Sequence, residues 1–159
     1  MTHIRIVSGG QTGVDRAALD VARALGLSCG GWCPRGRKAE DGMIDSRYPL
    51  VETPELDYGV RTAFNVRDSD GTLVLTSGAP TGGTAHTIHC AKGAGKPYLV
   101  VDLERPIAPD EIVRWIGREQ IRSLNVAGPR ASRVPGIYEQ ASAHLSQVLS
   151  QFIAQGSSR

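Results

Sequence analysis

Two glycine-rich turns constrain the fold of this chain more than any other feature, because each follows a short apolar run and precedes a helical pattern. The first turn, residues 8–13, lies between the apolar run 4–7 and residues 14–25, whose apolar positions keep helical spacing. The second turn, residues 77–83, lies between the apolar run 71–76 and another helical segment. A unit of strand, glycine turn and helix is therefore predicted twice.

The rest of the chain continues this alternation. Further strands are predicted at residues 28–32, 48–52, 97–103 and 124–127, and further helices at residues 58–66, 84–92, 109–121 and 135–153. Strands that alternate with helices pair in parallel through right-handed crossovers. We therefore expect an α/β fold, a three-layer, doubly wound (Rossmann-like), mainly parallel sheet of about five strands, closed by the strand 124–127.

The length and net charge of the chain limit the number of domains and the kinds of partner that we expect. A chain of 159 residues fits one domain, which we expect at residues 1–155 with a flexible tail at 156–159. The net charge of +2 comes from intermixed basic and acidic residues, so neither nucleic acid nor a membrane surface is an expected partner. The chain has three cysteines, no basic segment followed by a long apolar run at its start, and no stretch of about 20 apolar residues. A cytoplasmic protein is expected.

The glycine turns predict an anion-binding site. Glycine permits a sharp turn, and the amides at the start of the following helix lack helical partners and can hold an anion together with nearby hydroxyl and amide groups. Ligands of doubly wound sheets lie beyond the carboxyl ends of the strands, where we expect the two turns to face each other from neighbouring strands. The predicted binding residues are Gly9, Gly10, Gln11, Thr12, Gly13, Ser77, Gly78, Thr81, Gly82, Gly83 and Thr84. The alternative is two tight turns without a ligand.

The turns match neither common nucleotide motif. The glycines do not fit G-x-G-x-x-G, and no acidic residue stands about twenty residues further on, as a nicotinamide site requires. Neither turn ends in the Gly-Lys-Ser/Thr of a P-loop.

The sequence alone does not fix the roles of the charged residues near the turns. The loop 34–42 is predicted to be exposed and basic, and its Arg35 and Lys38 either bind the anion or are merely solvated. Asp15 and Asp41 are candidates for accepting hydrogen bonds from amino groups of a ligand. In the helix 58–66 and just after it, Arg61 and Arg67 are expected to point outward.

One helical cluster has metal-ligating residue types. His86, His89 and Cys90 fall at i, i+3 and i+4, which places two imidazoles and a thiol near one face. Cys90 stands among small apolar residues, as a core cysteine does, and no fourth ligand has matching spacing. We therefore expect no structural zinc there.

Four blocks in order resemble the molybdenum carrier (molybdenum cofactor carrier protein) family: residues 8–16, 31–42, 65–72 and 82–84, within a similarity that spans about residues 4–103. The resemblance implies a Rossmann-like fold, a homo-oligomer, and a non-enzymatic carrier. Such a carrier binds the molybdenum cofactor (molybdopterin), or molybdate, for storage, protection or delivery to molybdoenzymes. On this resemblance the glycine backbones and the hydroxyls of Thr12, Thr81 and Thr84 hold oxyanions, while Arg35 and Lys38 add charge.

The chain also resembles a wider group with similar folds, the cytokinin-activating phosphoribohydrolases, which have also been called lysine decarboxylases. These enzymes share the turn Pro-Gly-Gly-x-Gly-Thr-x-Glu-Glu, where this chain has Gly82-Gly83-Thr84-Ala85-His86-Thr87. His86 and Thr87 replace the two acids, and hydrolysis of this kind needs a carboxylate. The resemblance therefore favours binding over catalysis. A nucleoside-monophosphate phosphoribohydrolase and a nucleotide-sensing module remain the alternatives.

The helical pattern at residues 135–153 has more apolar positions than one sheet face is expected to cover. Together with the family resemblance, this pattern predicts a homo-oligomer.

Overall fold

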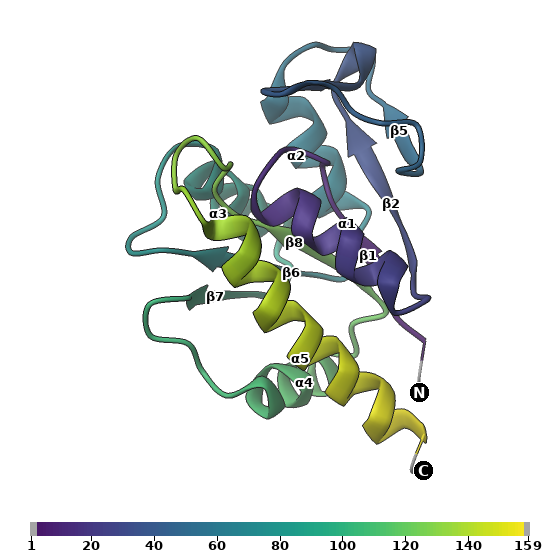
Figure 1. The fold of residues 1–159 in the computed structure, drawn as a ribbon, viewed down its shortest axis with the longest axis vertical. Helices are drawn as coiled ribbons and strands as arrows, with labels where there is room; N and C mark the ends of the chain where they lie inside the picture. The colour runs from purple at the N-terminus through teal and green to yellow at the C-terminus, as the bar shows by residue number, and fades with distance from the viewer. Residues whose placement is uncertain (1–2, 158–159) are drawn as a thin grey trace.

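The computed structural model describes residues 3–157 and contains a six-stranded parallel sheet with helices on both faces (Figure 1). The sheet and its helices are formed by β1 (Arg5–Val7), α1 (Val14–Ala24), β2 (Ser28–Cys33), β5 (Leu50–Glu52), α2 (Tyr58–Arg67), β6 (Gly71–Thr76), α3 (Gly82–Ala94), β7 (Tyr98–Asp102), α4 (Pro109–Arg118), β8 (Ser123–Ala127) and α5 (Ile137–Ser157). The doubly wound α/β prediction is confirmed. The sheet has six strands rather than about five, because the short β5 pairs with β2 at one edge.

The strand order is β5-β2-β1-β8-β6-β7, so β8 lies in the middle of the sheet. Its neighbours are β1, where Ile6 pairs with Leu124, and β6, where Leu73 pairs with Val126. The prediction that residues 124–127 close the sheet is therefore wrong. The glycine turns also do not follow neighbouring strands, because β8 separates β1 from β6. The physical reason is that the chain returns from the edge strand β7 through α4 to the centre, a step that local pattern does not specify.

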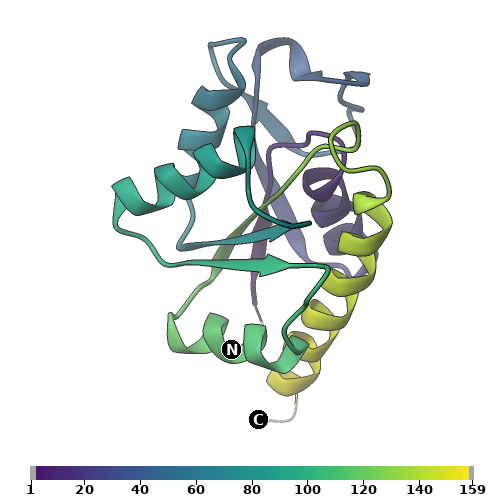
Figure 2. The same cartoon turned by 90° about the vertical axis from the view of Figure 1, so that its left-hand side faces the viewer.

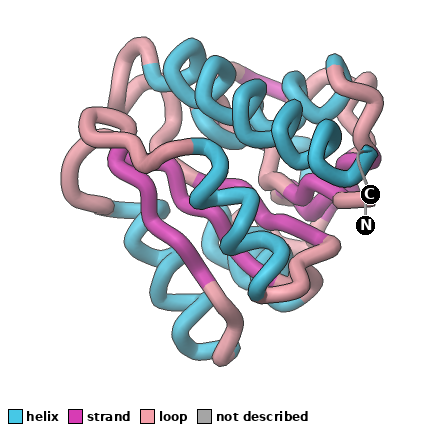
Figure 3. Tube along the Cα trace, turned by 90° about the horizontal axis from the view of Figure 1, so that it is seen from below, coloured by secondary structure: helices cyan, strands magenta, loops and turns pink. Residues whose placement is uncertain are grey.

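The helices form two layers. Helices α1 and α4 pack against α5 on one face, and α2 packs against α3 on the other. Figure 2 separates these two groups, and Figure 3 shows helices on both sides of the strands. This arrangement leaves the carboxyl ends of β1, β8 and β6 between the starts of α1 and α3.

The main core lies between the sheet and the layer of α1, α4 and α5. Five apolar side chains of α5 are fully buried in it: Ile137, Ala141, Leu145, Val148 and Leu149. The apolar stripe that motivated the oligomer prediction is thus covered within one chain, and the oligomeric state stays a prediction. Helix α5 begins at residue 137 and continues to Ser157, into the expected tail, whereas residues 158–159 lie outside the described part of the chain.

The expected basic loop has more structure than the sequence indicates. It contains a short 3-10 turn, Arg35–Arg37, and a hairpin of β3 (Lys38–Ala39) and β4 (Gly42–Met43). The Arg37 guanidinium donates hydrogen bonds to four backbone carbonyls of residues 44–50. The loop therefore folds around Arg37 over a second small apolar cluster.

No helix among residues 3–157 is long and apolar enough to cross a membrane. All three cysteines are free.

Candidate functional site

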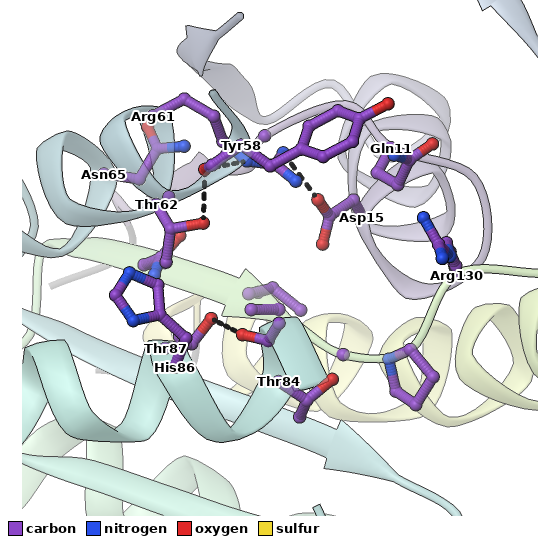
Figure 4. Close-up of a pocket in the computed structure, with 18 of the residues that line it drawn as sticks. Gln11, Asp15, Tyr58, Arg61, Thr62, Asn65, Thr84, His86, Thr87 and Arg130 are labelled. Carbon is purple, nitrogen blue, oxygen red and sulfur yellow. Dashed lines mark hydrogen bonds and ion pairs between the residues drawn. The ribbon is translucent and has the colours of Figure 1, made fainter. Parts of the chain in front are cut away.

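A cavity of about 190 Å³ opens at the carboxyl ends of the central strands (Figure 4). Its walls come from the first glycine turn, from α2, from the start of α3, and from β8 with the loop that follows it. The lining residues are Gly9, Gln11, Asp15, Tyr58, Gly59, Arg61, Thr62, Asn65, Thr81, Gly83, Thr84, His86, Thr87, Arg133 and the continuous segment 125–130. This is the position at which doubly wound sheets bind ligands.

The first glycine turn contributes Gly9 and Gln11 to the cavity. Gly10 has a φ of +76°, and a Cβ there would lie 2.5 Å from Leu50 and 3.0 Å from Ile44, so it faces an apolar cluster. Gly13 has a φ of +80°, and its Cβ would meet the carbonyl oxygen of Pro129 at 2.3 Å. Glycine at these two positions therefore serves the folding of the turn against its neighbours.

Thr12 is engaged by the protein itself. Its hydroxyl donates a hydrogen bond to Glu40 and accepts one from the Ala131 amide at 3.1 Å. Thr12 does not line the cavity, although Gln11 beside it does.

The two ends of the second glycine turn have different surroundings: its start contacts carboxylates of the protein, and its end lines the cavity. At its start, the Ser77 hydroxyl donates to Glu104 at 3.1 Å and the Gly78 amide donates to Asp102 at 3.1 Å. These two residues bind carboxylates of the chain, and they do not line the cavity. At its end, Thr81, Gly83 and Thr84 do line it.

The start of α3 offers free donors to the cavity. The backbone hydrogen bonds of this helix begin at the Thr84 amide, which donates to the Thr81 carbonyl, and the Thr81 side chain makes no capping hydrogen bond. Among the described residues, the amides of Gly82 and Gly83 have no partner, as expected at a helix start. Beside them lies Arg133, because a Cβ on Gly82 would stand 3.4 Å from Nη2 of that guanidinium.

The basic loop does not reach the cavity wall. Lys38 lies over the ring of Tyr58, with Nζ 4.7 Å from the ring centroid, and Arg35 has an exposed side chain. Tyr58 does line the cavity, so Lys38 stands behind a lining residue.

A buried ion pair was missed by the sequence interpretation. Arg61, expected to point outward, is only 8% exposed, and its Nη1 lies 3.2 Å from Oδ2 of Asp15, which is 6% exposed. Figure 4 shows the two side chains directed toward each other from α2 and α1. Burial raises the pKa of Asp15 above its usual value, and the Arg61 charge opposes this shift.

Gly9 makes room for this pair. A Cβ at Gly9 would lie 1.7 Å from Nη1 of Arg61, so the guanidinium occupies the space that a side chain would fill. The sequence signal for a buried Arg61 was therefore a glycine 52 positions earlier in the chain.

Arg130 and Arg133 were also missed. Both lie in the loop after β8, and both line the cavity. Arg130 lies 3.6 Å from Glu40, whereas Arg133 forms no ion pair within residues 3–157. They were missed because β8 was expected at the edge of the sheet, away from the turns.

Asp41 does not line the cavity. Asp41 pairs with Arg16 at 3.0 Å, and this guanidinium lowers the pKa of Asp41.

His86 lines the cavity and its Nε2 lies 3.5 Å from Sγ of Cys90, while burial raises the pKa of that thiol. No group of three His, Cys, Asp or Glu side chains suited to a metal ion occurs among the described residues.

The site therefore combines free helix amides, the Thr84 hydroxyl and three arginines with one buried carboxylate. The amides, the hydroxyl and the guanidinium groups are donors for an oxyanion, and Asp15 is an acceptor.

Comparisons with known proteins agree with this fold. The crystal structure of the putative molybdenum carrier protein from Syntrophus aciditrophicus is similar to this chain, with 43% sequence identity and a TM-score of 0.87. The alignment covers 93% of this chain and 96% of that one. No curated protein matches the sequence. The model of the circularly permutated YpsA SLOG family matches residues 6–149. This chain belongs to the circularly permutated YpsA SLOG family.

Proposed function

We propose that the protein is a carrier that binds the molybdenum cofactor in this cavity and holds it through its phosphate. The observation that carries the proposal is the unpaired Arg133 beside the free amides of Gly82 and Gly83. A guanidinium at a helix start is a strong arrangement for holding a phosphate group. The similarity to a protein named as a molybdenum carrier supports the choice of this ligand.

The other side of the cavity suits the rest of the cofactor. A pterin ring carries N–H groups, for which Asp15 is a buried acceptor. The cofactor brings its own dithiolene sulfurs to molybdenum, and no lining residue is a cysteine. The residues present therefore fit the cofactor.

The size of the cavity favours a carrier. Its 190 Å³ is below the roughly 300 to 1,000 Å³ of pockets that surround most of a drug-sized ligand. We expect the phosphate end to be enclosed while the rest of the cofactor stays at the open mouth. Such a ligand remains accessible to a molybdoenzyme that receives it.

Calorimetric titration of the isolated cofactor, phosphate and molybdate tests this proposal. Arg133→Ala should weaken cofactor binding at least ten-fold at low salt and less at high salt, because its contribution is a partly screened charge. Thr84→Val keeps the side-chain shape but removes the hydroxyl that faces the cavity, and should cost about 1.5 to 3 kcal/mol. Arg118→Ala, which removes the same charge from α4, is the matched control. Cofactor binding that Arg133→Ala leaves unchanged would reject the proposed site.

A second candidate, a nucleoside-monophosphate phosphoribohydrolase, gains support from Asp15. The acids that such enzymes carry after the glycine turn are replaced here by His86 and Thr87, but Asp15 places a buried carboxylate in the same cavity. A carboxylate can stabilise a developing positive charge on the sugar. Steady release of free base from nucleoside monophosphates by the wild type, abolished in Asp15→Asn, would favour the hydrolase over the carrier.

A further inference from the structure

The carboxylate of Glu40 is held by donors on both of its oxygens. One oxygen accepts hydrogen bonds from the Thr12 hydroxyl and, at 3.1 Å, from the Ser132 amide. The other accepts a hydrogen bond from the Ser132 hydroxyl and lies 3.6 Å from Nε of Arg130. We call the donors Thr12, Arg130 and Ser132 the Glu40 cradle. Hydroxyls, an amide and a guanidinium around one group are the donors with which proteins hold oxyanions.

The cradle favours a charged occupant. Burial by itself would raise the pKa of Glu40, but the hydrogen bonds from Ser132 and Thr12 and the charge of Arg130 outweigh it, so the pKa is lowered. The occupant is also accessible, because the Glu40 side chain keeps 20% of its exposure. An anion that arrives from solvent can therefore compete with it.

The Glu40 cradle adjoins the cavity. Arg130 belongs to both, since it lines the cavity and contacts Glu40. Gln11 connects them as well, because it lines the cavity and its Oε1 accepts hydrogen bonds from the amides of Glu40 and Thr12. A ligand that lies against Gln11 and Arg130 is thus next to the donors that hold Glu40.

We propose that the Glu40 cradle is a second oxyanion subsite, which Glu40 fills in the absence of ligand and which a tetrahedral oxyanion of the ligand, phosphate or molybdate, takes over. The inference rests on the proposed function only in that the cavity holds the first anionic group of the same ligand. A ligand with two anionic ends then binds at the α3 start and at the cradle. The hairpin of β3 and β4 stays anchored meanwhile, because Asp41 remains paired with Arg16.

The test follows the Ser132 amide by nuclear magnetic resonance during separate titrations with inorganic phosphate and molybdate. Glu40→Ala vacates the cradle and should bind at least one of the two anions ten-fold or more tightly than the wild type does, with a saturable shift of the Ser132 amide. Glu111→Ala is the matched control, because it removes the same exposed carboxylate from α4, away from the cradle and from the Asp41–Arg16 pair that anchors the hairpin. Adding Thr12→Val to Glu40→Ala should remove most of the gain.

The wild type should show the same Ser132 shift at higher anion concentration, since Glu40 competes for the donors. The anion whose titration shifts the Ser132 amide, phosphate or molybdate, is the preferred occupant of the Glu40 cradle. The proposal is overturned if Glu40→Ala binds neither anion more tightly than Glu111→Ala does, or if the wild type never shows the shift. Failure of the proposed function has a different signature, namely cofactor binding that is insensitive to Arg133→Ala while the cradle titrations behave as described.

Discussion

Replacing Gly9 with alanine tests whether this glycine is needed to admit the Arg61 guanidinium. A Cβ at Gly9 would stand 1.7 Å from Nη1 and 2.6 Å from Cζ of Arg61. The backbone of Gly9 is not in the left-handed region, so alanine adds no backbone strain and acts through sterics alone. Because the tip of an arginine is flexible, we expect the guanidinium to swing away and the 3.2 Å ion pair with Asp15 to be lost.

The loss of stability in Gly9→Ala depends on which interactions the Asp15 carboxylate retains once the Arg61 guanidinium has moved away. Removing one partner of a fully buried ion pair destabilises a protein by about 3 to 5 kcal/mol. Here the cavity admits water, and the Gln11 amide still favours the Asp15 carboxylate. We therefore expect Gly9→Ala to lower the free energy of unfolding by about 2 kcal/mol at neutral pH, below the fully buried limit.

This cost should depend on pH with a definite sign. A carboxyl whose folded-state pKa is raised stabilises the fold below its unfolded pKa, and this contribution is lost as pH rises through the folded pKa. Burial raises the pKa of Asp15, and loss of the Arg61 charge raises it further. The stability gap between wild type and Gly9→Ala should therefore shrink as pH falls toward the ordinary value of 3.8, by about 1.4 kcal/mol for each unit by which the two folded pKa values differ.

Urea unfolding followed by circular dichroism measures the effect. Gly83→Ala is the matched stability control, because it lies in the same cavity wall but a Cβ there meets nothing within 4 Å. It should be neutral or more stable by up to about 1 kcal/mol, since alanine favours the helix. In an Asp15→Asn background, Gly9→Ala should cost less. An unchanged free energy of unfolding in Gly9→Ala, or an equal loss in the Asp15→Asn background, would refute the steric reasoning.

Four further outcomes are expected. Lys96→Met removes a cation that donates to three carbonyl oxygens at the end of α2 and should lower the free energy of unfolding by about 1 to 3 kcal/mol in thermal denaturation. Burial lowers the pKa of His144, so stability should fall as pH drops below the ordinary 6.5, and His144→Leu should flatten that decline in unfolding at successive pH values. Light scattering should give a particle larger than 17.0 kDa, and a 17.0 kDa particle at micromolar concentration would count against the homo-oligomer. Elemental analysis after chelator dialysis should find no stoichiometric zinc, and one zinc per chain would contradict our interpretation of His86, His89 and Cys90.

Local patterns were enough to predict most strands and helices. Gly71–Thr76 is a buried strand with the predicted bounds, because a run of apolar residues between turn signals can hardly be anything else in an α/β chain. The order of the strands in the sheet could not be predicted from local sequence patterns. Residues 124–127 have the pattern of a buried strand whether they lie at the centre or at the edge of the sheet, and the choice depends on how α4 returns the chain across the sheet.

The candidate site could be predicted only in part for the same reason. Thr81, Gly83 and Thr84 follow from the glycine turn itself, and the structure places them at the cavity. The place of Arg61 in the cavity wall does not follow from the sequence pattern, because charged residues in helices usually face solvent. Its burial depends on Asp15, 46 residues earlier, and on the space left by Gly9.

These placements change what the glycine turns contribute. Gly9 admits an arginine, Gly13 admits the Pro129 carbonyl, and Gly10 admits two apolar side chains, so the first turn is shaped by close contacts within the chain. In the second turn, the amide of the lining residue Gly83 has no partner among the described residues. The cations that we expect to meet an anion therefore come from α2 and from the loop after β8, brought there by the central position of β8. It follows that a variant at Gly10 or Gly13 reports on folding, whereas variants at Arg133 and Thr84 report on the ligand, and the two kinds of experiment should not be interpreted in the same way.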